Sequence, residues 1–134
     1  MRVEMSALCD AATEAGGKLN ILGAFDAIQI PQYPFVIPHC ALVFRLRFNR
    51  VEGGEHKIRV NFVDQDGKDI MPALEANAQV LIPEGQDSRV TNLIMNMSGL
   101  KIPLKGKYSI DLAVDGRHEI SLPLTALEIN LPEN

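Results

Sequence analysis

The feature that most constrains the fold is an alternation of apolar and polar residues with a period of two, which dominates the chain from His39 onward. Such alternation is typical of β-strands that place one face on a core. Three segments, 40–48, 57–63 and 106–114, show it cleanly. Their apolar sets are Cys40, Leu42, Phe44, Leu46 and Phe48; Ile58, Val60 and Phe62; and Tyr108, Ile110, Leu112 and Val114. The pattern predicts strands that pair over a shared core.

Turn signals separate these strands. Asp115 and Gly116 stand between two alternating runs, which predicts a tight hairpin into a return strand at 118–127. The segment 91–99 is interpreted as a further strand, although parts of it are apolar on both faces. Three prolines within 30–38 remove ladder donors and therefore predict an irregular crossing.

The first quarter of the chain is compatible with two periodicities. Apolar residues in 1–15 fit one side of a helix, and they also alternate as in a strand. The segment 14–17 offers a turn, and the β-branched and aromatic residues of 18–30 favour a central strand, with Gly23 as a bulge or a point of close packing. We expect strand, turn, strand.

The chain of 134 residues is long enough for one domain with its own core. About eight short strands at spacings of roughly 8 to 12 residues predict an all-β fold. We therefore expect a single antiparallel β-sandwich over residues 1–134, immunoglobulin-like in general architecture. The triplet Gly106-Lys107-Tyr108 resembles the tyrosine position of immunoglobulin-like sandwiches, although the chain has no Trp.

The link between the strands at 40–48 and 57–63 predicts a hairpin. Matching apolar faces requires even sums of paired positions, such as Phe48 with Ile58, and a three-residue loop 52–54 satisfies this requirement. The same register gathers basic side chains on the outer face of the hairpin. These are Arg45, Arg47, Lys57 and Arg59. The four residues are our candidate binding surface, although a solvated charged face is the commoner outcome for such a pattern.

An acidic loop offers a second candidate site. Asp64, Asp66 and Asp69 surround Gly67, and clustered carboxylates are calcium ligands. Glu75 falls at the twelfth place counted from Asp64, as in an EF-hand, but the glycine falls fourth instead of sixth. Asp and Gly also dominate ordinary turns. A turn is the favoured interpretation, with calcium binding as the alternative.

Several stretches together resemble a family of short bacterial proteins catalogued as a domain of unknown function. They are GGKLNILGAFD (16–26), FRLRF with EGGEH, FVDQDG, and the closing GKYSIDLAVDGRHEISLPL. The resemblance extends over nearly the whole chain. It implies a single all-β domain and a strand at the N-terminus. It transfers no catalytic or binding residue, because the family has no assigned activity.

Composition and charge narrow the classes of partner. A net charge of −4 argues against nucleic acid or an anionic membrane as the main partner. No apolar run approaches the length of a membrane span, and acidic residues interrupt the first seventeen positions, so we expect a cytoplasmic protein. Cys9 and Cys40 have neither disulfide nor zinc spacing, which predicts buried reduced thiols.

No motif for catalysis stands out. The serines lack a nucleophile-elbow context, and His39, His56 and His118 share no spacing, although a triad could assemble in space from separate strands. We predict no cofactor. The leading hypothesis is a non-enzymatic protein-binding module that uses the basic face or a sheet edge, and such an edge could also pair copies of the chain. The alternative is a small-molecule-binding or hydrolytic sandwich with a pocket at one end.

Overall fold

The computed structural model of the protein describes residues 1–130, which form nine β-strands and one turn of 3-10 helix. The elements are β1 (Arg2–Ala15), β2 (Lys18–Ala24), β3 (Ala27–Ile30), β4 (Phe35–Asn49), η1 (Arg50–Glu52), β5 (Gly54–Val63), β6 (Leu74–Val80), β7 (Ser88–Ile102), β8 (Gly106–Val114) and β9 (Arg117–Glu128). The all-β prediction is confirmed, and so is the strand at the N-terminus. Within residues 1–130, no helix has the length and apolar character needed to cross a membrane.

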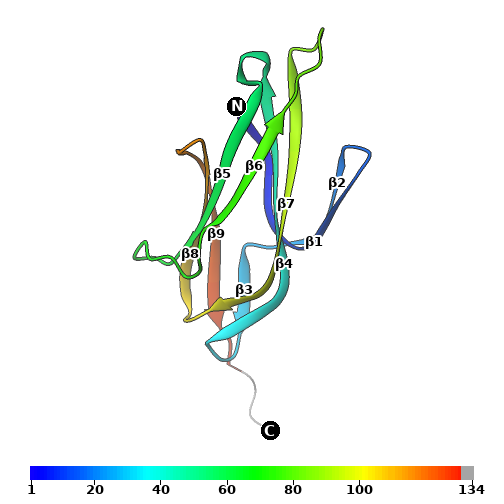
Figure 1. Cartoon of the computed structure of the whole chain (residues 1–134). Helices are drawn as coiled ribbons and strands as arrows, with labels where there is room; N and C mark the ends of the chain where they lie inside the picture. Colours follow the sequence, from blue (N-terminus) through cyan, green and yellow to red (C-terminus); the bar gives the residue numbers. More distant parts are fainter. Residues whose placement is uncertain (131–134) are drawn as a thin grey trace.

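The strands form two packed sheets, as expected for a β-sandwich (Figure 1). Sheet A has the order β2-β1-β4-β7, and sheet B has the order β3-β9-β8-β5-β6. Paired strands run antiparallel in every case but one, because β3 lies parallel to β9. Chain order and spatial order differ, since consecutive strands repeatedly cross from one sheet to the other.

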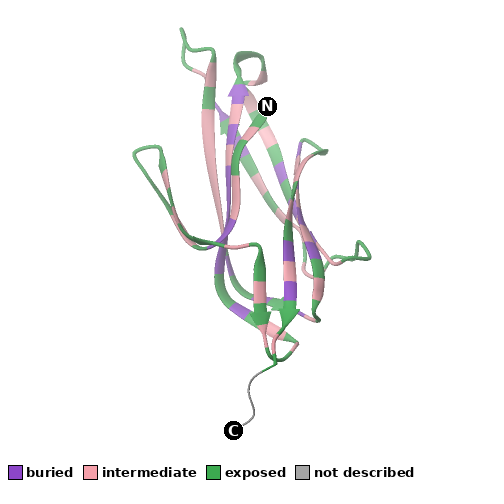
Figure 2. Ribbon diagram, turned by 180° about the vertical axis from the view of Figure 1, so that it is seen from behind, coloured by how far each residue is buried: buried purple, intermediate pink, exposed green. Residues whose placement is uncertain are grey.

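The core lies between the sheets and is built from the alternating apolar positions. Phe44 and Phe48 of sheet A are fully buried, and Phe62 and Ile110 of sheet B are at most 2% exposed. Buried and exposed positions alternate along the strands (Figure 2). The predicted inward sets of 40–48, 57–63 and 106–114 are confirmed. Because alternate side chains of these three segments enter this core, the pattern specifies which of their faces turns inward.

The hairpin at Asp115 and Gly116 is confirmed. Both residues have positive φ, 52° and 80°, which a type I′ turn requires and which Asp and Gly tolerate. Tyr108 begins the preceding strand and is buried. Its hydroxyl donates a hydrogen bond to the carbonyl oxygen of Leu104 at 2.6 Å, as the resemblance to an immunoglobulin-like tyrosine position suggests.

The predicted hairpin between residues 48 and 58 is wrong. β4 pairs with β1 and β7 in sheet A, whereas β5 pairs with β6 and β8 in sheet B. The connection is η1, whose Glu52 carboxylate accepts a hydrogen bond from the Asn49 N–H at 2.9 Å. This bond caps η1, through which the chain crosses from sheet A to sheet B instead of folding back on the same sheet.

The predicted central strand at 18–30 is also wrong, because it is two strands at the edges of different sheets. β2 ends at Ala24, and β3 begins at Ala27. Between them the Phe25 N–H donates to the Leu8 carbonyl in sheet A at 2.8 Å, and the Asp26 carbonyl accepts from the Thr125 N–H in sheet B at 2.9 Å. This crossing joins the two sheets along one lateral side of the sandwich.

Residues 10–24, the end of the β1–β2 hairpin, extend beyond the pairing of β1 with β4, and we call this segment the arm (Figure 1). It packs over the outer face of the sheet and forms a second, smaller apolar cluster there. Ala12, Leu19 and Ile21 contribute from the arm, and Cys9, Ala41, Val43 and Ile94 from the sheet. Cys9 and Cys40 are both free and fully buried, as predicted, but they lie in different clusters.

Candidate functional site

The predicted basic surface does not form. Arg45 and Arg47 lie on β4 in sheet A, whereas Lys57 and Arg59 lie on β5 in sheet B. All four alternate with core-facing positions, so the two pairs project from opposite outer faces of the sandwich. The prediction failed because it assumed that β4 and β5 are neighbours.

Glu4 pairs with both arginines of sheet A and offsets part of their charge. Its carboxylate accepts hydrogen bonds from Arg47 Nε at 2.7 Å, Arg2 Nη2 at 3.0 Å and Arg45 Nε at 3.2 Å. The bond from Arg47, followed by the bond from Arg2, lowers the pKa of Glu4 from 4.5 to about 2. The β-bulge between Val3 and Met5 sets the Glu4 side chain among the arginines. This cluster is therefore already paired within the chain.

The basic pair of sheet B is partly neutralised as well. Arg59 Nη1 lies 2.7 Å from Glu75 Oε1 on the adjacent strand β6. Both side chains are more than half exposed, so this ion pair is of the weak surface type. The four basic side chains therefore do not form the single positive surface on which the prediction rested.

The acidic loop is a turn, as the favoured interpretation held. One carboxylate oxygen of Asp64 accepts from the backbone N–H groups of Asp66 and Lys68 at 2.9 and 3.0 Å. Asp69 instead accepts from the side-chain amide of Asn61 at 3.1 Å. Among residues 1–130, no group of three His, Cys, Asp or Glu side chains is arranged to hold a metal ion. The predicted metal candidates Asp64, Asp66 and Asp69 therefore do not converge.

One set of Ser, His and Asp side chains does converge, on the outer face of sheet B. Ser121 and Ser109 both donate to Asp111 Oδ1 at 2.6 Å, and His118 Nε2 lies 2.8 Å from Ser121 Oγ. Because the Ser121 hydroxyl proton points to Asp111, His118 is the donor to Ser121. A catalytic triad needs the opposite arrangement, in which histidine accepts the serine proton. The cluster is a hydrogen-bond network across β8 and β9.

His56 ties the two sheets together at one end of the sandwich. Its ring stacks on Phe48 of sheet A with a centroid distance of 4.5 Å. Nδ1 lies 2.6 Å from Asp115 Oδ2, and Nε2 lies 2.5 Å from the carbonyl oxygen of Glu52. Burial alone would lower the pKa of His56, but the two acceptors outweigh burial and raise it. The protonated ring can donate to both acceptors at once, which the neutral ring cannot do.

The edge of sheet A at β7 is a further candidate site, and none of the predicted site residues lies on this strand. Within residues 1–130, β7 has β4 as its only neighbour in the sheet, along a register from Ser88 to Ile102. Eleven consecutive residues, 90–100, carry no charge. The other strands at the sheet ends, β2, β3 and β6, have seven, four and seven residues. A long, uncharged edge without proline is a template for pairing with another chain.

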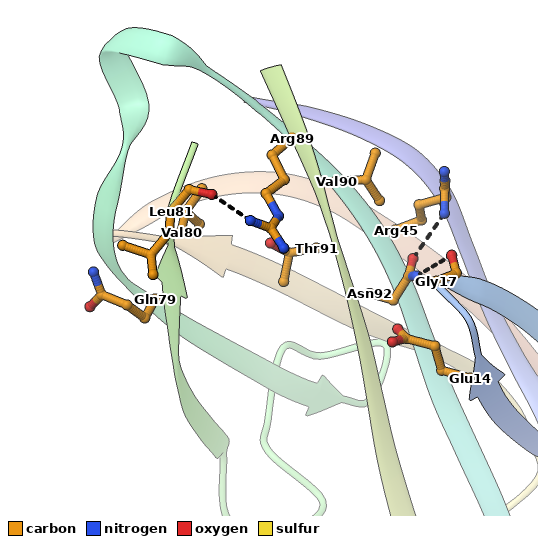
Figure 3. A pocket seen from close by; sticks show the side chains of 10 residues that line it. All are labelled: Glu14, Gly17, Arg45, Gln79, Val80, Leu81, Arg89, Val90, Thr91 and Asn92. Atoms are coloured by element: carbon orange, nitrogen blue, oxygen red, sulfur yellow. Dashed lines mark hydrogen bonds between the residues drawn. The ribbon is translucent and has the colours of Figure 1, made fainter. Parts of the chain in front are cut away.

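Two separate cavities lie beside this edge, one toward each end of β7. One of about 380 Å³ lies beside Arg89 and Asn92, between the end of β6 and the tip of the arm (Figure 3). Another of about 380 Å³ lies beside residues 96–101, against the loop at 70–74. β7 therefore has one cavity toward each end of its edge, on the lateral side opposite the crossing at residues 25 and 26, and we call the one beside Arg89 and Asn92 the cleft.

Polar contacts hold the walls of the cleft in place. Arg89 donates to the Leu81 carbonyl at 2.8 Å, which fixes the chain as it leaves β6. Asn92 accepts from Arg45 at 3.3 Å and donates to the Gly17 carbonyl at 3.2 Å (Figure 3). These bonds set the arm tip on one side of β7 and the end of β6 on the other. These hydrogen bonds therefore fix the shape of the cleft without a bound partner.

The core-facing side of the edge is incompletely covered. Leu93 and Met95 point toward the core opposite Phe44 and Leu42, yet both are only partly buried. On the facing sheet, Ala76 of β6 is also partly buried. An extended chain added to β7 would cover these side chains and satisfy outward backbone groups at the same time.

The fold and this edge define a class: a β-sandwich that leaves one long strand open beside a cleft. The chain belongs to the family of unknown function DUF6941, whose model matches residues 4–127. Among curated proteins, none matches the chain. The resemblance predicted from sequence is therefore confirmed, and the family description assigns no activity.

Proposed function

We propose that the protein is a non-enzymatic binding module of the bacterial cytoplasm that recognises a protein partner by strand addition at β7. The observation that carries the proposal is the free 15-residue edge with its uncharged stretch at 90–100. Main-chain hydrogen bonds would supply affinity, and alternate side chains of the added strand would enter the cleft on either side. The predicted basic surface has no part in this version.

The proposal can be tested with one lysine placed on the edge. Asn96 is exposed near the middle of β7, and a lysine there is the kind of residue that natural sheets use to block edges. Asn96→Lys should reduce capture of a partner from the native cell at least tenfold. The matched control is Gln29→Lys, which adds the same charge on the exposed edge strand β3 of the other sheet. An identical set of captured proteins for the wild type and both variants would refute edge binding.

A second candidate is a small-molecule site on the opposite lateral side. A cavity of about 420 Å³ there is lined by Leu8, Phe25 and Pro123 with one carboxylate, Asp26. Apolar walls and a single acidic group suit a small cationic amine. Such a ligand would raise the midpoint of thermal unfolding of the wild type but not of Asp26→Asn. Equal shifts in both proteins would exclude this site.

A further inference from the structure

We propose that the strand added to β7 is an acidic segment of a partner protein, with two acidic residues on its outward face opposite Val90 and Asn92. This inference rests on the proposed use of the β7 edge and specifies the chemistry of the partner. Arg45 and Arg47, one half of the predicted basic surface, supply the complementary charge. Main-chain pairing alone gives these two arginines no role.

An excess of positive charge remains on the outer face of sheet A. Arg2, Arg45 and Arg47 all bond the carboxylate of Glu4, so three positive charges meet one negative charge. Arg2 also lies directly opposite Arg47 in the register of β1 and β4. Like charges in opposed positions destabilise a sheet, and a further anion relieves the repulsion. The cluster is therefore able to accept more carboxylates than the chain itself provides there.

Both arginines of β4 reach toward the open edge. Glu4 belongs to β1, which lies on one side of β4, and β7 lies on the other side. Arg45 Nη1 donates to Asn92 Oδ1 at 3.3 Å, and Arg47 Nη1 donates to Ser88 Oγ at 2.9 Å. Each guanidinium group therefore extends from Glu4 to a side chain of β7. A strand added to β7 would lie only about 4.8 Å farther out.

The register of sheet A selects the positions of the acidic residues. Arg45 is directly opposite Asn92, and Arg47 is directly opposite Val90. Directly opposed residues share a face of the sheet, so the partner residues opposite Val90 and Asn92 lie on the same outer face as the arginines. These two partner residues are two positions apart in the partner sequence.

A third arginine adds positive charge to the same end of β7 from the other face. Arg89 lies on the core-facing side of the strand, and it lines the cleft together with Arg45 and Glu14 (Figure 3). Residues 93–100 of the edge carry no charge. We therefore expect the acidic residues at the end of the partner strand that lies beside residues 88–92.

A displayed library of random decapeptides tests the inference. Peptides are selected on the wild-type protein and counter-selected on Asn96→Lys, so that only peptides that need the β7 edge are kept. The kept peptides should be enriched in pairs of Asp or Glu two positions apart. The lysine of the counter-selection variant itself attracts acidic peptides, so counter-selection works against this enrichment and does not produce it.

The outcome separates this inference from the proposed function. Peptides that need the edge but show no enrichment of paired acidic residues would overturn the acidic partner and leave strand addition at β7 standing. If no peptide distinguishes the wild type from Asn96→Lys, both proposals fail.

Two double variants then locate the charge. Arg45→Gln with Arg47→Gln should weaken binding of a selected peptide with two glutamates about 2- to 30-fold, because two exposed ion pairs are lost. Lys57→Gln with Arg59→Gln removes the same charge from the outer face of sheet B and should leave the affinity unchanged. Fluorescence anisotropy of the labelled peptide measures both dissociation constants. Equal losses in the two double variants would overturn the assignment to sheet A.

A change in the peptide covers the case in which the arginine variant perturbs the Glu4 cluster. Replacing both peptide glutamates by glutamine leaves the protein unaltered and should weaken binding to the wild type by a similar factor. The same replacement should have little further effect on the Arg45→Gln, Arg47→Gln variant. Equal losses on both proteins would show that the peptide carboxylates do not meet these arginines, which would overturn the inference.

Discussion

At the scale of single residues, several polar side chains form hydrogen bonds that hold neighbouring parts of the chain together. The hydroxyl of Tyr108 is the clearest case, because the ring is 6% exposed and its oxygen bonds both the carbonyl and the N–H of Leu104. These bonds hold the chain where it passes from β7 to β8. The sequence indicated that Tyr108 occupies a position like the conserved tyrosine of immunoglobulin-like sandwiches. It did not indicate that Leu104 would be the hydrogen-bond partner.

Removing this hydroxyl should cost stability. Tyr108→Phe keeps the ring in the core and deletes the hydrogen bonds to Leu104, so we expect the free energy of unfolding to fall by about 0.5–1.5 kcal/mol. Urea denaturation measures the change. Tyr33→Phe is the control, since it deletes a similar bond to the Leu127 carbonyl, 2.7 Å long, at an exposed site. An equal loss in both variants would contradict a special role for the buried corner.

Glu4 should control how stability responds to acid. Its folded pKa of about 2 lies below the ordinary value of 4.5, so its stabilising effect is full above pH 4.5 and is lost as the pH falls toward 2. Glu4→Gln should therefore be less stable than the wild type at pH 7, and the difference should shrink at pH 2.5. Unfolding curves at both pH values check this. Glu14→Gln, at an exposed position on the arm, is the matched control.

At the scale of elements, local geometry sets how each strand leaves its sheet. The arm shows this at Gly23, which has φ of 67° and lies beside Asp10 of β1. A Cβ atom built there would come within 2.9 Å of the Asp10 carboxyl carbon. Glycine therefore allows β2 both its left-handed residue and its close approach to β1.

An alanine scan of the arm separates these two effects. Gly16→Ala meets only the backbone strain of φ 58°, since no atom lies within 4 Å of its Cβ, and should cost about 1 kcal/mol. Gly23→Ala meets similar strain and the contact with Asp10, so it should cost more. Denaturant midpoints give both values. A loss at Gly23 no greater than at Gly16 would show that Asp10 moves aside freely.

The connections between elements explain which parts of the fold could be predicted. Alternation identifies the inward face of a strand, and it correctly selected Phe48 and Ile58, but it does not say which strands are neighbours. The parity of Phe48 and Ile58 was consistent with a hairpin that does not exist. Asn49 and Glu52 carry the spacing of a capping box, the one local signal that could have indicated η1 and a crossing.

At the scale of the whole molecule, the two lateral sides of the sandwich differ. One side is bridged by Phe25 and Asp26, and the other is left open between β6 and β7. An open edge depends on the strand order of both sheets, which is a non-local property. The uncharged stretch at 90–100 was visible in the sequence, but only the topology shows that it lies at the end of a sheet. The candidate site could therefore not be located from the sequence.

The link between the sheets at His56 should make global stability fall on the alkaline side. The folded pKa of His56 is raised, so its contribution is full below the unfolded value of about 6.5 and is lost as the pH rises through the folded pKa. His56→Gln should lose about 0.2–1 kcal/mol relative to wild type at pH 6 and less at pH 8.5. The exposed His39→Gln is the control. A pH-independent difference for His56→Gln would rule out this linkage.

Because Cys9 lies in the small cluster under the arm, the rate at which its thiol is labelled would measure how often the arm opens. Cys9 is sealed by the arm on the outer face of sheet A, and its thiol donates to the Ala41 carbonyl at 3.5 Å, whereas Cys40 lies in the main core. A thiol reagent should therefore modify Cys9 whenever the arm lifts, but Cys40 only when the sandwich unfolds. The ratio of the two labelling rates would report how often the arm opens, in the native chain and without an added probe.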